Sequence, residues 1–226
     1  MPSAGHRENI EIALLLDGIY RKYGFDFRNY AHASLKRRIW KSVHAEELKS
    51  VTGLLERLLH DPAAMERFLI TISVDTTALF RDPGFYLALR RTVAPFLREL
   101  PFFRVWHAGC ASGEEVYSMA ILLQEEGLYA KSRIYATDMN EVLIEKAKSG
   151  IYPLRAMQEY TENYQQAGGA GSLSEYYTAS HGHVLIKPSL RQNIVWGQHN
   201  LVTDSSFNEF QLIICRNVMI YFDTTL

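Results

Sequence analysis

The sequence predicts an α/β protein in which a small N-terminal helical bundle precedes a Rossmann-like domain. Residues 1–80 space their apolar side chains as helices do and show no strand pattern. Residues 81–226 alternate short apolar strands with helices, and a glycine-spaced turn follows the first strand. A stretch at about 172–190 interrupts this alternation. We therefore expect domains at 1–80 and 81–226, with a small antiparallel β insert in the second.

Four helix-spaced segments fill the N-terminal domain. They cover residues 10–23, 34–43, 46–60 and 63–72. Gly24 is expected to end the first helix, and the Asp61-Pro62 pair to end the third. A small helical bundle is the arrangement that buries these apolar stripes together.

The second domain reads as strands and helices in turn. Asp82 and Pro83 are a predicted N-cap and first turn of a helix that reaches about residue 99. Strands are predicted at 103–108, 133–137, 194–198 and 211–215, and helices at 114–126 and 140–150. This order favours a parallel sheet covered by helices. In the insert, Tyr176 to Ile186 predicts a hairpin around His181-Gly182.

Composition excludes several functional classes. The 226 residues carry a formal net charge of −1, which argues against a nucleic-acid-binding surface. Cys110 and Cys215 form neither a disulfide framework nor a metal-ligand pattern, so no metal site is expected. The chain has no apolar run of membrane-spanning length and no signal-peptide layout at its start. We expect a cytoplasmic protein without membrane insertion.

The glycine-spaced turn carries the most chemical information. Gly109 and Gly113 are not followed by the third glycine of the dinucleotide fingerprint. Glu114 and Glu115 stand in the first turn of the next helix, where they would repel a pyrophosphate. S-adenosylmethionine contains no phosphate and carries a sulfonium and an ammonium group. The turn therefore predicts S-adenosylmethionine binding and a methyltransferase.

Asp138 follows the second predicted strand. An acid at this place accepts hydrogen bonds from ribose hydroxyls in nucleoside-binding α/β folds. The alternative is an acid that merely caps a loop or the next helix. Together with the glycine turn, Asp138 favours the ribose interpretation.

Five segments give the chain a recognisable resemblance. TTALFRDP (76–83), GCASGEEVYS (109–118), ATDMNEVLIEKAKSGIY (136–152), QHNL (198–201) and CRNVMIYF (215–222) resemble the chemotaxis receptor glutamate methyltransferase family, CheR. The match is collinear and includes the helical domain. The resemblance implies a class I methyltransferase fold and methyl transfer from S-adenosylmethionine to glutamates on cytoplasmic chemoreceptor helices, with S-adenosylhomocysteine as the product.

The resemblance also implies site residues, carried over position by position. The implied cofactor-binding residues are Asp75, Thr77, Arg81, Gly109, Glu115, Asp138, Asn200, Leu201, Arg216 and Asn217. Asp75 departs from the family, since many members have Asn there. Arg81 and Tyr221 are the implied catalytic pair.

The chemistry of the reaction explains what that pair would do. A glutamate side chain with a pKa of about 4.3 is already ionised at neutral pH, so the nucleophile needs no general base. An arginine and a tyrosine are suited to orient the acceptor carboxylate. The alternative role for Arg81 is an ion pair between the two domains.

A basic group on the second helix has two interpretations. Arg37, Arg38 and Lys41 either form an ordinary solvated helix face or dock acidic receptor helices. Because the family supplies an acidic helical partner, docking is favoured. The short turn around His181 to Val184 resembles members that do not depend on a receptor's C-terminal pentapeptide.

Two other functions remain open at this point. One is a non-catalytic module that binds S-adenosylmethionine and serves as a sensor or scaffold. The other is a methyltransferase that acts on a different signalling protein. The chain also stops at Leu226, before a class I sheet would be complete, so we expect that C-terminal strands are missing.

Overall fold

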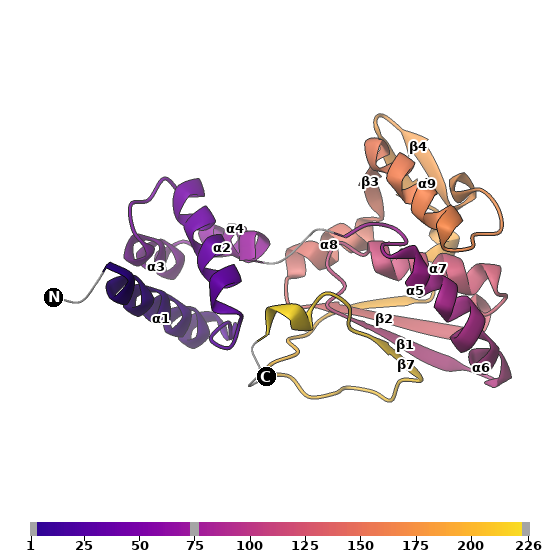
Figure 1. Cartoon of the computed structure of the whole chain (residues 1–226), viewed down its shortest axis with the longest axis horizontal. Helices are drawn as coiled ribbons and strands as arrows, with labels where there is room; N and C mark the ends of the chain where they lie inside the picture. The colour runs from indigo at the N-terminus through magenta and orange to yellow at the C-terminus, as the bar shows by residue number, and fades with distance from the viewer. Residues whose placement is uncertain (1–3, 73–76, 223–226) are drawn as a thin grey trace. The chain divides into compact units, whose positions relative to one another are not determined.

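The computed structural model describes residues 4–72 and 77–222. The chain divides into two compact units (Figure 1). The helical unit contains Met1–Val74, Asn200–Ser205 and Arg216–Leu226, and the sheet unit contains Asp75–His199 and Ser206–Cys215. The all-helical N-terminal region and the parallel sheet confirm the predicted fold class. The assignment of roles to residues 1–80 and 81–226 stays a prediction.

The helical unit is built on four helices. They are α1 (Ala4–Tyr23), α2 (His32–Ala45), α3 (Val51–His60) and α4 (Pro62–Ile72). Each contributes side chains that are fully or almost fully buried, and these form its core: Leu15, Ile19, Ile39, Leu54, Leu58 and Phe68. Burying one such side chain contributes about 1.5–3 kcal/mol, which explains why four short helices hold together. As predicted, α1 ends before Gly24, whose φ of +76° requires the left-handed region.

The third helix is shorter than its apolar pattern predicts. It begins at Val51 rather than at Glu46, because Ser50 caps it: the Gly53 backbone N–H donates to Ser50 Oγ at 3.0 Å. Glu47 adopts a left-handed φ of +56°, which breaks any helix running through it. A cap of this kind contributes about 1 kcal/mol to helix stability.

The sheet unit contains a four-stranded parallel sheet. Its strands are β1 (Phe103–Ala108), β2 (Ser132–Asp138), β6 (Ile194–Gln198) and β7 (Leu212–Ile214), in the order β6-β2-β1-β7. All three strand pairs are parallel. Phe103, Val105, Ile134 and Ala136 are fully buried in the two central strands. Among the described residues, β7 pairs only with β1.

Helices cover this sheet in the predicted order. They are α5 (Pro83–Ala88), a π-helical turn (Leu89–Val93), α6 (Ala94–Glu99), α7 (Glu114–Glu125) and α8 (Glu141–Ser149). Gly150, with a φ of +63°, ends α8 as predicted. Asp82 and Pro83 occupy the N-cap and the first helical position, as predicted, but Asp82 has a left-handed φ of +57° and its side chain makes no capping hydrogen bond to α5.

The insert forms a second, three-stranded sheet. Its strands are β3 (Ile151–Pro153), β4 (Tyr177–Ser180) and β5 (His183–Ile186), all antiparallel and ordered β3-β5-β4. The predicted hairpin is confirmed, with Ser180 opposite His183 across a two-residue turn. The insert also recruits β3, which the sequence did not predict. In Figure 1, β3, β4 and α9 (Met157–Gln166) group together beside α7.

The buried carboxylate of Glu125 links the insert to α7. Glu125, in the last turn of α7, accepts hydrogen bonds from the hydroxyls of Tyr164 and Tyr176, the latter at 3.0 Å. Arg90 forms an ion pair with the same carboxylate, and both side chains are less than one-tenth exposed. Tyr164 and Tyr176 therefore anchor the insert to α7. Within residues 4–72 and 77–222, no helix is long and apolar enough to cross a membrane.

Candidate functional site

The glycine turn between β1 and α7 is held by the neighbouring strand. The backbone N–H groups of Gly109 and Cys110 both donate to the carbonyl oxygen of Thr137, at 2.8 and 2.9 Å. Gly109 and Gly113 have φ values of +80° and +90°, so the turn needs glycine at both ends. A Cβ on Gly113 would lie 2.8 Å from Ala147 Cβ, which shows how closely the start of α7 packs on α8.

Asp138 sits at the carboxyl end of β2 and reaches across to this turn. Its Oδ2 accepts the Ala111 N–H and its Oδ1 accepts the Asn140 N–H, each at 2.9 Å. The residue is 8% exposed, and burial raises the pKa of its carboxyl group against the opposing effect of these hydrogen bonds. Asn140, not Asp138, caps α8 by accepting the Val142 N–H at 3.0 Å. Asp138 is thus a loop-bracing acid beside the turn predicted to bind the cofactor.

The two acids that open α7 have different surroundings. Glu114 is 5% exposed, and Ser112 Oγ donates to its Oε2 at 2.7 Å. Glu115 keeps 18% of its side chain exposed. Its charge also helps to raise the pKa of Cys215, where burial is the larger cause. Of the two acids, Glu115 is the one that a ligand can reach.

His107 lies beside the candidate site, although the sequence favours an ordinary histidine at the end of a strand. It lies in β1, its side chain is 1% exposed, and its Nδ1 lies 3.0 Å from Glu115 Oε1. Its Nε2 is buried without a hydrogen-bond partner among the described residues. The only signal in the sequence is a polar residue inside an apolar strand just before a glycine turn.

The segment containing Thr77 and Arg81 is attached to α7. The Phe80 backbone N–H donates to Ser118 Oγ at 2.8 Å, and Ser118 Oγ donates to the Glu114 carbonyl oxygen at 2.7 Å. This segment therefore lies one helical turn from the acids. Thr77 and Arg81 are half-buried. Asp75 lies outside the described residues.

The remaining predicted cofactor residues group with the helical unit. Asn200 and Leu201 lie in a tight turn, in which Asn200 Oδ1 accepts the Val202 N–H at 3.0 Å and Asn200 N–H donates to Asp204 Oδ2 at 2.8 Å. Arg216 is half-buried, and Asn217 has a left-handed φ of +58°. Tyr221 ends a short 3₁₀ turn, and its side chain lies outside what the structure describes.

The thiols near the turn are poor nucleophiles. Burial, followed by the nearby charge of Asp138, raises the pKa of Cys110 well above its usual value. Burial likewise raises the pKa of Cys215. Across the described ranges, no group of three or more His, Cys, Asp or Glu side chains is placed to hold a metal ion. The arrangement suits binding and orientation better than covalent catalysis.

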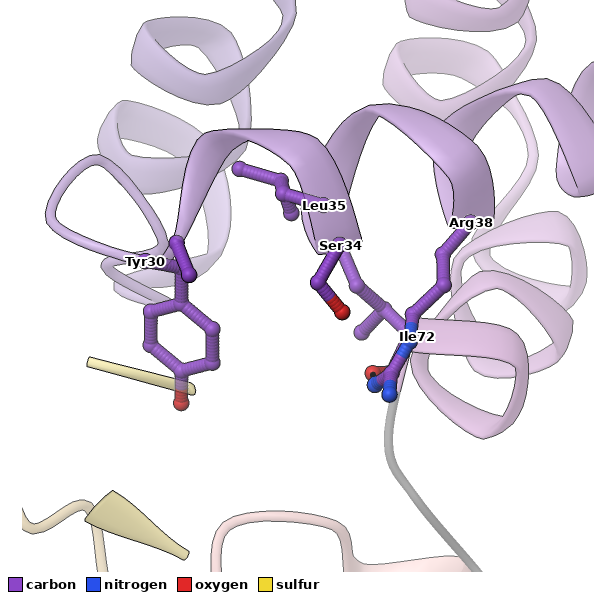
Figure 2. Close-up of a pocket in the computed structure, with 6 residues that line it drawn as sticks. Tyr30, Ser34, Leu35, Arg38 and Ile72 are labelled. Carbon is purple, nitrogen blue, oxygen red and sulfur yellow. Dashed lines mark hydrogen bonds between the residues drawn. The ribbon is translucent and has the colours of Figure 1, made fainter. Parts of the chain in front are cut away.

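The predicted basic face of α2 is smaller than expected. Arg37 and Lys41 are exposed, but Arg38 is half-buried and donates to the carbonyl oxygen of Ile72 at the end of α4. Figure 2 shows the Arg38 side chain folded against Ile72, beside a pocket lined also by Tyr30 and Ser34. Arg38 therefore links two helices of the unit.

Two family models together match almost the whole chain. The model described as "CheR methyltransferase, all-alpha domain" matches residues 10–73, and the one described as "CheR methyltransferase, SAM binding domain" matches residues 75–226.

Individual proteins give the same result. A Pseudomonas putida protein named "Putative methyltransferase Cher3" is 50% identical over 218 residues, which is 96% of this chain and 80% of that protein. A "Chemotaxis protein methyltransferase" of Listeria monocytogenes is 30% identical over 206 residues, covering 90% of this chain and 76% of its own. One of Salmonella typhimurium is 30% identical over 218 residues, covering 92% and 72%.

Proposed function

Because the chain belongs to the CheR family of S-adenosylmethionine-dependent methyltransferases, we propose that it methylates glutamate side chains of chemoreceptors. The observation that carries the proposal is the arrangement at the carboxyl ends of β1 and β2. There the glycine turn, the partly exposed Glu115 and the loop-bracing Asp138 surround one edge of the sheet. Ligands of open α/β sheets bind at this edge.

The charges around this edge suit the cofactor. Glu115 is the proposed partner of the cofactor's ammonium group, and Asp138 the proposed acceptor for its ribose hydroxyls. A carboxylate offers about four lone-pair sites. The backbone N–H groups of Ala111, Asn140 and Met139 use part of this capacity on Asp138, and the rest is available to a hydroxyl. The other proposed cofactor-binding residues are Asp75, Thr77, Arg81, Gly109, Asn200, Leu201, Arg216 and Asn217.

The proposed reaction needs orientation rather than proton transfer. S-adenosylmethionine supplies, when bound, an electrophilic methyl group on a positively charged sulfur. The acceptor glutamate is ionised at neutral pH, so its oxygen would accept that methyl group without a general base, and the bond electrons would stay on sulfur. Arg81 and Tyr221 are proposed to hold that carboxylate in line. The raised pKa of Cys110 keeps its thiol protonated and outside this chemistry.

The helical unit is the proposed docking surface for the receptor. Its exposed cations on α2, Arg37 and Lys41, suit an acidic helical partner. Arg38 contributes to the surface mainly by fixing α2 to α4. The hairpin of the insert turns through only His181 and Gly182. On this basis we expect receptor recognition that does not depend on a C-terminal pentapeptide.

The test is a transfer assay on purified protein. Tritiated S-adenosylmethionine and a receptor cytoplasmic fragment should give label in the fragment, released by mild base as methanol, as methyl esters are. A receptor fragment with its methylation-site glutamates changed to glutamine is the matched control and should take up no label.

Each other outcome points to a different function. Tight binding of the cofactor without transfer to any acceptor would favour a sensor or scaffold. Base-labile label on another signalling protein, with none on receptors, would favour the second alternative. Label that resists base would exclude carboxyl methylation.

A further inference from the structure

The side chains of His107 and Glu115, which flank the glycine turn in sequence, are in contact; the first is buried and the second is partly exposed. His107 projects from β1 with 1% of its side chain exposed, and Glu115 from the first turn of α7 with 18% exposed. The atoms in contact are His107 Nδ1 and Glu115 Oε1, at 3.0 Å. The pair is separate from the Asp138 hydrogen bonds that brace the same turn.

The contact determines which ring nitrogen carries the proton. An ionised carboxylate can only accept a hydrogen bond, so Nδ1 must be the donor. The buried Nε2 has no partner among the described residues. A proton there would be a buried donor with nothing to donate to, which is costly. Of the two neutral tautomers, the one protonated at Nδ1 is therefore the one that fits these contacts.

This tautomer has a consequence for Glu115. A neutral histidine donates a hydrogen bond without cancelling the negative charge of the carboxylate. A glutamate near a helix start has several rotatable bonds, and the hydrogen bond removes part of that freedom before any ligand arrives. The contact thereby holds the carboxylate in one place.

We propose that His107 is a positioning residue, which holds the Glu115 carboxylate ready for the ammonium group of S-adenosylmethionine. The inference rests on the proposed role of Glu115. It adds that recognition of the amino-acid end of the cofactor is preorganised by a histidine buried inside the sheet. His107 itself does not touch the methyl group or the acceptor.

The test compares two ligands and two substitutions. S-adenosylhomocysteine carries the ammonium group, whereas 5′-methylthioadenosine keeps the nucleoside and lacks the amino-acid end. His107→Leu removes the donor, and its affinity for S-adenosylhomocysteine should fall about tenfold, the loss typical of one charged hydrogen bond. Its affinity for 5′-methylthioadenosine should stay within about twofold.

His107→Asn restores a donor near the position of Nδ1 and should recover most of the lost affinity for S-adenosylhomocysteine. Ser132→Ala, a buried polar substitution elsewhere in the sheet, should leave the ratio of the two affinities unchanged.

The outcomes separate this inference from the proposed role of Glu115. If Glu115→Gln weakens S-adenosylhomocysteine binding but His107→Leu does not, the positioning role alone is wrong. If His107→Leu weakens both ligands equally, the histidine is only structural, and the inference also fails. If Glu115→Gln does not change the affinity for S-adenosylhomocysteine, the ammonium role of Glu115 is wrong, and this inference fails as well. Nitrogen-15 NMR of the wild-type protein should show a proton on Nδ1 of His107, and protonation at Nε2 alone would contradict the proposal.

Discussion

The carboxylate of Asp138 binds the backbone N–H of Ala111 at 2.9 Å, across the gap between β2 and the glycine turn. Ala111 has a φ of +46°, an uncommon conformation for a residue with a Cβ. The second oxygen of the same carboxylate holds the backbone N–H of Asn140 at the start of α8. One side chain therefore fixes both the conformation of the glycine turn and the backbone that leads from β2 into α8. Any ribose-binding role of Asp138 comes in addition to this bracing role.

Asp138→Ala should weaken S-adenosylhomocysteine binding at least about tenfold, because it removes a charged acceptor from the proposed ribose site and from the turn. Asp138→Asn keeps one acceptor oxygen and should lose less affinity for S-adenosylhomocysteine. Calorimetric titration measures both. The 2′-deoxy form of the ligand is the control, since it should lose less affinity than the parent ligand in either variant. A folded alanine variant with unchanged affinity would show that the ribose assignment is wrong.

The same residue should leave a signature in stability against pH. Burial raises the pKa of Asp138 above the ordinary aspartate value of 3.8. A carboxyl group with a raised pKa binds more protons in the folded state, so its contribution to stability is fully present below that ordinary value. The contribution is lost as the pH rises through the raised pKa.

The free energy of unfolding of the ligand-free protein should therefore fall relative to Asp138→Asn as pH rises across this window. Denaturant unfolding at a series of pH values measures the difference. The comparison cancels the groups whose pKa is lowered, such as Glu46 beside Arg67. A difference that instead grows in favour of the wild type with rising pH would contradict the burial argument.

Gly113→Ala should be strongly destabilising. The new Cβ would lie 2.8 Å from Ala147 Cβ and 3.2 Å from Ala147 Cα, at a φ of +90°. Left-handed strain alone costs about 1–2 kcal/mol, and the overlap with α8 adds to it. Gly127→Ala is the matched control, because its φ is +69° but nothing lies within 4 Å of the added Cβ. Chemical denaturation should give Gly113→Ala a much lower free energy of unfolding than Gly127→Ala. Equal losses would mean that α7 and α8 do not pack as closely as described.

Arg81→Ala and Tyr221→Phe should lower turnover more than cofactor affinity if these residues orient the acceptor carboxylate. The reason is that the lost interaction forms with the acceptor and strengthens only as the methyl group is transferred. Initial rates on a receptor fragment, set beside titration with S-adenosylhomocysteine, separate the two effects. Arg81→Lys keeps the charge but not the planar fork, and should recover only part of the rate. A loss of cofactor affinity in proportion to rate would move Arg81 to the cofactor-binding residues, and full rates would remove both from the site.

Local patterns were enough to predict most of the fold. The strands at 103–108 and 132–138 are short segments whose buried positions are mostly apolar, and Gly24 and Gly150 end helices because the chain needs a left-handed residue there. The failures came where backbone conformation overrides residue type. Asp82 looks like a cap, yet its own left-handed φ leaves it without a capping bond to α5.

Contacts between distant segments were harder to predict. The pairing of β3 with β5 joins segments separated by a whole helix, and three residues give no periodicity to detect. His107 and Glu115 meet only because the glycine turn folds back between them. The sequence groups Arg38 with Arg37 and Lys41 on one helix face. In the structure, Arg38 instead donates to the carbonyl oxygen of Ile72 at the end of α4. Motifs predict which residues form the candidate site, whereas the hydrogen-bond partners of those residues come from the structure.

The docking role of α2 predicts a specific effect of charge. Reversing Arg37 and Lys41 to Glu should slow methylation of a receptor fragment while leaving S-adenosylhomocysteine affinity unchanged, since both cations are exposed and belong to the helical unit. Surface charges speed association and are screened over about 8 Å at physiological salt. Added salt should therefore slow the wild type more than the double variant. Arg7→Glu with Lys49→Glu makes the same change in net charge on exposed residues outside α2, and should keep wild-type salt sensitivity.

Arg38→Ala separates docking from helix packing on the same face. It removes the donor to the Ile72 carbonyl, so it should lower the free energy of unfolding, which the Arg37 and Lys41 reversals should not do. Thermal unfolding of the three proteins, run beside the rate assay, distinguishes the two effects. If the double reversal and the Arg7 and Lys49 control slow methylation equally, the effect is one of net charge, and α2 is an ordinary solvated face. If only the double reversal slows methylation and loses its salt dependence, the exposed cations of α2 contact the receptor.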